Sequence, residues 1–162
     1  MTIRIGVTGH QQLADDSGWA WVREAMSDVV MRQRKPVEAV SSLARGSDQT
    51  FADVVIRSGG TLYAVIPFAG YERTLDGPAL DEYKRLLGSS HSETLHAGSD
   101  DEGAYLAAGR RVAELSSFMV AVWDGAPARG KGGTADIVAY ARARGTPICW
   151  LNPVIRTIKE LS

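Results

Sequence analysis

The chain has few of the residues that mark disulfide-rich or metal-binding proteins. It has 162 residues, with a single cysteine and three histidines. One thiol cannot form an internal disulfide, and Cys149 stands in an apolar segment, so we interpret it as a small core residue. The histidines, His10, His91 and His96, are too scattered to predict a zinc site. The sequence therefore predicts neither a disulfide framework nor a metal centre.

Long apolar runs and an excess of one charge are also lacking. No apolar stretch approaches the roughly 20 residues of a membrane span, so no membrane partner is expected. The 18 lysines and arginines nearly balance the 19 aspartates and glutamates, so no basic field indicates a nucleic-acid partner. The chain opens directly on a strand-like segment without a secretion signal, and we expect a cytoplasmic protein.

What is present is an alternation of strand and helix signals along one domain, residues 1–162. Several strands are apolar throughout, which indicates a mostly parallel sheet with helices on both faces, an α/β fold of about six strands. The predicted strands are 3–7, 37–43, 62–67, 118–123 and 147–151, with a shorter one near 93–96. The predicted helices are about 18–34, 49–57, 79–87, 100–115 and from 134 onward. The tail, 152–162, is expected to form a short helix.

The stretch 118–140 carries the strongest functional signal. An apolar run ends at Asp124 and Gly125, a glycine-rich loop with Arg129 and Lys131 follows, and Thr134 opens a helical pattern. Glycines let backbone N–H groups approach an anion, and a helix N-terminus adds partial positive charge. We therefore predict that the segment Gly-Lys-Gly-Gly-Thr, 130–134, holds a phosphate. The alternative is a plain connection with a glycine-rich turn.

Two common nucleotide motifs are incomplete, so no cofactor is predicted. Residues 125–132 almost fit a P-loop, but Gly132 stands where a Ser or Thr would bind Mg²⁺. The first strand runs into Gly9 and His10 without the third glycine of a dinucleotide fingerprint, which argues against a classical NAD enzyme.

Three loops follow predicted parallel strands, at Gly9 and His10, at 45–48 and at 124–134. In such sheets ligands bind beyond the carboxyl ends of the strands, at a switch in strand order. We expect the three loops to meet there. Arg45 and Asp48 have an alternative interpretation as an ordinary helix start, in which Ser47 or Asp48 caps the helix.

Several segments resemble the SLOG superfamily, which joins DNA-processing protein A (Smf) with the Lonely guy, lysine-decarboxylase-like proteins. Residues 40–55 are similar to its Ser-Gly-x-Ala-x-Gly-(Ile/Ala)-Asp segment, 108–125 to its arginine-containing helix and following strand, and 130–136 to its Gly-Gly-x-Gly-Thr motif. The resemblance implies a Rossmann-like fold that binds a nucleotide or nucleotide-derived ligand. Related proteins are often dimers, and the apolar helix 19–30 is a candidate surface for a homodimer.

The loops and the resemblance together give the predicted ligand-binding residues. These are Gly9, His10, Arg45, Gly46, Ser47, Asp48, Arg110, Arg111, Asp124, Gly125, Lys131, Gly132, Gly133 and Thr134.

The resemblance favours binding, as in a sensor, over hydrolysis. Lonely guy enzymes cleave the N-glycosidic bond of a nucleoside monophosphate with a Glu three residues after the motif Thr, and that position here is Ile137. The rival prediction is a nucleoside-phosphate N-glycosidase in which Asp48, Asp124 or Asp136 is catalytic. A third and weaker one is a single-stranded DNA-binding module.

Overall fold

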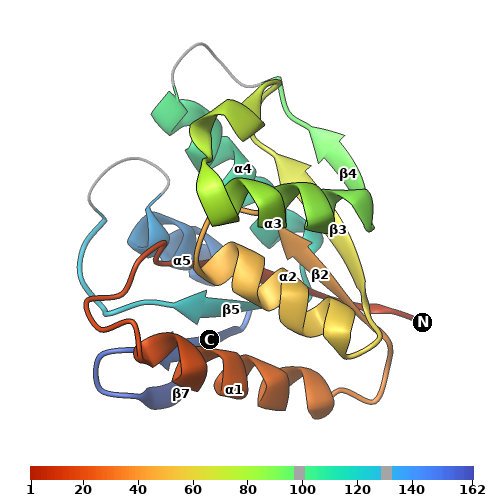
Figure 1. Ribbon diagram of the computed structural model, residues 1–162. Helices are drawn as coiled ribbons and strands as arrows, with labels where there is room; N and C mark the ends of the chain where they lie inside the picture. Colours follow the sequence, from red (N-terminus) through yellow and green to blue (C-terminus); the bar gives the residue numbers. More distant parts are fainter. Residues whose placement is uncertain (97–100, 129–132) are drawn as a thin grey trace.

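A single seven-stranded sheet runs through the protein, with strand order β4-β3-β2-β1-β5-β6-β7 (Figure 1). The computed structural model describes residues 1–96, 101–128 and 133–162. Neighbouring strands from β4 to β6 are parallel, and β7 pairs antiparallel with β6 at one edge. The predicted α/β class, with a mostly parallel Rossmann-like sheet, is confirmed.

The elements alternate along the chain as the sequence pattern predicts. The strands are β1 (Ile3–Gly9), β2 (Val37–Ser41), β3 (Thr61–Ile66), β4 (Ser90–Thr94), β5 (Phe118–Val122), β6 (Ile148–Asn152) and β7 (Thr157–Leu161). The helices are α1 (Gly18–Met31), α2 (Ser47–Arg57), α3 (Gly77–Gly88), α4 (Asp101–Leu115) and α5 (Thr134–Ala143), with a 3-10 turn, η1 (Tyr71–Thr74). Among the described helices, none is both long and apolar enough to cross a membrane.

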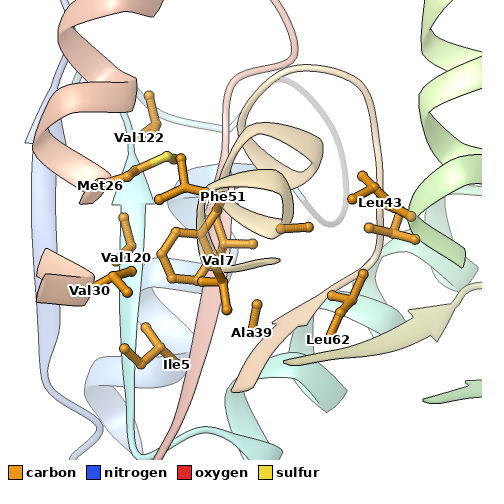
Figure 2. Close-up of a cluster of buried hydrophobic side chains, with 14 of the residues drawn as sticks. Ile5, Val7, Met26, Val30, Ala39, Leu43, Phe51, Leu62, Val120 and Val122 are labelled. Atoms are coloured by element: carbon orange, nitrogen blue, oxygen red, sulfur yellow. The ribbon is translucent and has the colours of Figure 1, made fainter. Parts of the chain in front are cut away.

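The sheet is buried on both faces because its strands send alternate residues into two cores. On one face, α1, α2 and α3 cover a cluster that includes Ile5, Val7, Val120 and Val122. Figure 2 shows part of this cluster, where Phe51 of α2 and Met26 and Val30 of α1 meet the strands. On the other face, α4 and α5 pack on Met119, Ala121 and Ile148.

The tail corrects the sequence prediction, because residues 157–161 form β7 rather than a helix. The chain reverses after β6, where the Oδ1 atom of Asn152 accepts hydrogen bonds from the backbone N–H groups of Val154 (3.0 Å) and Ile155 (3.4 Å). This is an Asx turn, which favours chain reversal over a helix start. Pairing with the exposed edge of β6 then decides the conformation of the short tail.

Helix α1 does not offer the apolar surface expected for a homodimer. Its apolar residues pack against the sheet: Val22, Ala25, Met26, Val29 and Val30 are all buried. Trp19 and Trp21 also pack, partly buried, on the same core. The prediction of this surface is therefore wrong, because the apolar face of α1 is buried against the core of the same chain.

Strand order switches direction between β1 and β5, which are neighbours in the sheet. The chain leaves β1 toward α1 on one face and leaves β5 toward α5 on the other. The two connections diverge, and a cleft opens between them at the carboxyl edge.

Candidate ligand-binding cleft

A cleft of about 950 Å³ lies at the carboxyl edge of the sheet, over the switch point. Its walls come from the segments that follow β1, β2, β3 and β5, from α4 and the start of α5, and from the turn between β6 and β7. This volume is at the upper end of the range of small-molecule sites. The three loops singled out in the sequence do meet at this cleft.

The loops after β1 and β5 are joined across the switch point. The backbone N–H of Asp124 donates to Nε2 of His10 at 3.0 Å, and the Asp124 carboxylate is 3.4 Å from the same nitrogen. The backbone N–H of His10 in turn donates to the carbonyl of Val122 at 3.0 Å. Since Nε2 accepts the bond from Asp124, the neutral ring carries its proton on Nδ1. Both His10 and Asp124 line the cleft, so this contact fixes two sides of it.

The loop between β2 and α2 is held in an unusual backbone shape. Leu43 is fully buried with φ 57° and Gly46 has φ 81°, both in the left-handed half of conformational space. The Ser41 hydroxyl secures the turn by accepting from the N–H of Leu43 and donating to the carbonyl of Asp48, each at 3.1 Å. Such strained positions persist only where the surroundings determine them.

Gly46 and Ser47 lie behind the cleft and support it. A Cβ on Gly46 would be 2.4 Å from the carbonyl oxygen of Gln11, so the β2–α2 loop touches the β1–α1 loop directly. The Ser47 hydroxyl donates to the carbonyl of His10 at 2.7 Å. These predicted site residues therefore position the lining and do not form it.

Asp48 places a carboxyl group in the cleft where it is poorly compensated. Its Oδ2 accepts a long hydrogen bond, 3.4 Å, from the backbone N–H of Ala44. Desolvation raises the pKa of Asp48 from 3.8 to about 7, and the bond from Ala44 only partly offsets this rise. The group therefore exchanges a proton near neutral pH, which is the behaviour expected of an acid–base or proton-linked binding group.

The start of α5 faces the cleft through Gly133, Thr134 and Ala135. Gly133 is the N-cap residue, with φ −63° and ψ 164°, and makes no side-chain capping bond. The first N–H groups of a helix have no acceptor within the helix, so this end can receive an anion. Lys131 and Gly132, which the sequence also placed here, lie outside the described residues.

The structure separates the remaining predicted residues from the cleft lining. Arg111 forms an ion pair with Glu93 of β4 at 3.0 Å. Arg110 is exposed, with its guanidinium 5.1 Å from the Tyr140 ring centre. Asp136 and Gly125 are both exposed, outside the lining. A tandem of arginines on a helix gives no indication of which face the helix turns to a ligand.

Among the described residues, Arg45 is the predicted arginine that lines the cleft. Its Nη2 atom is 3.0 Å from Oδ1 of Asp76, whose side chain is 92% exposed. Ion pairs with a solvent-exposed partner are worth at most about 1 kcal/mol, so Arg45 can exchange this partner for a ligand anion at little cost.

Sequence reasoning missed an aromatic wall next to Asp48. Tyr71 of η1 is buried and its ring centre lies 6.3 Å from that of Tyr105 on α4; both residues line the cleft. Burial, then the neighbouring Asp48 carboxyl, raise the pKa of Tyr71 above its ordinary range. The signal available in the sequence was Pro67, which ends β3 and so marks a fourth loop at the same edge.

A metal centre is not indicated by the described side chains, which contain no group of three or more His, Cys, Asp or Glu able to hold an ion. The site chemistry in the described ranges consists instead of a helix N-terminus, an exchangeable arginine, a histidine–aspartate contact and a carboxyl group that titrates near neutral pH.

No protein-family model matches the chain, and a search of curated proteins finds no sequence relative. Solved structures do match. DNA processing protein A from Streptococcus pneumoniae aligns with a TM-score of 0.69 and 17% identity, over 93% of this chain and 50% of that one. The same protein from Helicobacter pylori, whose structure concerns its single-stranded DNA binding mode, gives 0.64 and 14%, over 93% and 65%.

A third match is the molybdenum cofactor carrier protein from Chlamydomonas reinhardtii, with a TM-score of 0.56 and 18% identity, over 93% of this chain and 76% of that one. The chain spans about half the length of the Streptococcus protein. At these identities the matches show a shared fold and leave the ligand open. The chain shares the α/β fold of these proteins, and DNA processing protein A is one of the proteins that its sequence motifs resemble.

Proposed function

We propose that the cleft binds a nucleotide or nucleotide-derived ligand, with its phosphate at the N-terminus of α5 and within reach of Arg45. The observation that supports this is the position of Gly133 and Thr134, which open a helix N-terminus into a large cleft at the switch point; within the described residues this end has no side-chain capping bond. Helix N-termini at this place in parallel sheets favour anions through their N–H groups and dipole.

The aromatic wall and the size of the cleft support an organic ligand rather than a bare anion. Tyr71, Tyr105, Pro67 and Leu75 provide apolar surface at one end, and the α5 N-terminus provides the anion site. We further propose that residues 1–162 act as one binding domain, since strands from both ends of the chain join one sheet. A cytoplasmic sensor is the role that we infer for it.

Replacement of Thr134 by Glu tests the anion site. The new carboxylate would stand in the first turn of α5, where it interacts favourably with the helix dipole, so stability should be kept. It would repel a phosphate, and affinity for nucleoside monophosphates should fall at least tenfold, a loss of about 1.4 kcal/mol. Calorimetric titration measures the affinity, and circular dichroism measures the melting temperature.

The matched control is Ala139→Glu, which adds the same charge to α5 at an exposed position outside the cleft lining. Its nucleotide affinity should stay close to that of the unmodified protein. If Thr134→Glu folds normally and binds nucleotides as tightly as Ala139→Glu does, the phosphate does not lie at α5.

An N-glycosidase is the second candidate function, because Asp48 has the near-neutral pKa that general acid–base catalysis favours. Incubation with nucleoside monophosphates would then release free base, measured chromatographically. Asp48→Asn should abolish the release while the nucleotide still binds, because the lost interaction belongs to the transition state. Binding without any base release across the panel would establish a sensor instead.

A labelled single-stranded oligonucleotide completes the panel, since the Helicobacter pylori match is described as binding single-stranded DNA. The formal net charge of −1 gives this chain little general attraction to a polyanion. We expect the oligonucleotide to bind more weakly than the mononucleotides at physiological salt.

A further inference from the structure

Helix α2 carries two aspartate side chains, Asp48 and Asp53, that lie in contrasting environments. The Asp53 side chain is 3% exposed and receives three guanidinium groups, from Arg23 at 2.8 Å, Arg57 at 2.9 Å and Arg85 at 2.6 Å. Although burial opposes ionisation, hydrogen bonds from the three arginines hold the pKa of Asp53 below its ordinary value. Asp53 is therefore compensated as a shielded carboxylate must be.

Asp48, in the first turn of the same helix, has no such partner within the described ranges. Its bond from Ala44 is long and comes from a neutral donor. The other ionisable side chains of the described chain that line the cleft are His10, Asp15, Arg45, Tyr71, Tyr105, Asp124 and Arg156. The cations among them have partners elsewhere: Arg45 with Asp76, and Arg156 with the Ser17 hydroxyl at 3.2 Å.

The loop geometry fixes Asp48 in the cleft. The carbonyl of Asp48 accepts from the Ser41 hydroxyl, and the following residue, Gln49, donates from its side chain to the carbonyls of Leu43 (3.1 Å) and Ala79 (2.9 Å). The backbone of Asp48 is thus fixed, and its carboxyl group lies in the cleft near Tyr71. An ionised carboxylate held in this way repels an anionic ligand.

We propose that Asp48 binds the ligand as a neutral carboxylic acid and donates a hydrogen bond to an acceptor atom of the nucleotide, so that binding takes up a proton. This inference rests on the proposed function, because the ligand is assumed to be an anion. An anion nearby favours the protonated form further, which makes proton uptake and binding mutually reinforcing. The aromatic wall beside Asp48 indicates that the acceptor belongs to the base or to the sugar oxygens next to it.

The experiment compares the unmodified protein with Asp48→Asn and Asp48→Ala. The probes are the 5′-monophosphates of adenosine, guanosine, cytidine and uridine, titrated by calorimetry at pH 6.0 and 8.5. Asp48→Asn keeps a neutral hydrogen-bond donor at every pH, whereas Asp48→Ala keeps none. Ionisation of the ligand phosphate affects all three proteins alike, so the ratio of affinities between two of the proteins reports on Asp48.

We expect the affinity of the unmodified protein, relative to Asp48→Asn, to fall more than tenfold between pH 6.0 and 8.5, as Asp48 loses its proton. Asp48→Ala should bind more weakly than Asp48→Asn at both pH values, because the donor is missing. The inference would be overturned if the affinity ratio of the unmodified protein to Asp48→Asn were equal at the two pH values, or if Asp48→Asn and Asp48→Ala bound the nucleotides equally well. Nucleotide binding itself would still stand in either case. Failure of the unmodified protein to bind any probe at pH 6.0 would overturn the proposed function itself.

Discussion

We expect Asp48→Asn to raise the free energy of unfolding of the ligand-free protein at pH 8.5. The gain should be about 2 to 4 kcal/mol larger than the change that the same substitution causes at pH 3.5. In the folded state the carboxyl pKa is raised from 3.8 to about 7 by desolvation. Between these two values the folded protein holds a proton that the unfolded chain releases. The free energy of unfolding therefore falls as pH rises through this window, and the loss is complete above pH 7. The amide does not ionise, so the variant avoids the loss.

Urea unfolding of both proteins at the two pH values measures the effect. The control is Asp81→Asn, which removes a carboxylate from an exposed position of α3 outside its first turn. Its free energy of unfolding should change little and by a similar amount at both pH values. If Asp48→Asn shifts stability equally at pH 3.5 and pH 8.5, the carboxyl group is not desolvated in the folded state.

Gly46→Ala should destabilise the protein by about 3 kcal/mol or more, the largest loss that we expect from a single added methyl group. Two costs combine at this position. The backbone has φ 81° and ψ −122°, a conformation that side chains disfavour. The new Cβ would also lie 2.4 to 2.7 Å from backbone atoms of Gln11, which cannot move as the end of a flexible side chain can.

Gly145→Ala separates the two costs. Gly145 also has a positive φ, 76°, but a Cβ there would meet nothing within 4 Å. It should lose only the conformational cost, about 1 to 2 kcal/mol. Denaturant unfolding of both variants tests the difference, and equal losses would mean that the contact between Gly46 and Gln11 is looser than the structure places it.

The positions of the parallel strands along the chain could be anticipated because apolar runs and glycine stops repeat in the sequence. Strands β1, β2, β3, β5 and β6 lie where the sequence predicts them. The tail differs because β7 is short and largely exposed, so its conformation depends on pairing with β6 rather than on its own pattern. Asn152 carried a turn signal that was readable in principle.

The cleft could be located from the sequence, but not all of the residues that line it could be predicted. His10 and Asp124 lie just after β1 and β5, and Arg45 and Asp48 lie in the loop after β2 and in the first turn of α2. The strand ends therefore bring them together. Tyr71 and Tyr105 lie on η1 and α4, and their approach depends on how these elements pack. Arg111 was misleading for the same reason, because its ion pair with Glu93 of β4 is a long-range contact.

The contact between His10 and Asp124 spans 114 residues of sequence, and this has a consequence for the order of folding. Strands β1 to β4 are neighbours in both chain and sheet, so this half assembles from contacts of smaller sequence separation than the β1–β5 pairing. Pairing of β1 with β5 must wait until most of the chain is available, and such non-local pairings are slow to form. We expect the cleft to be among the last regions to form, and a nascent or truncated chain that lacks β5 to be unable to recognise a ligand.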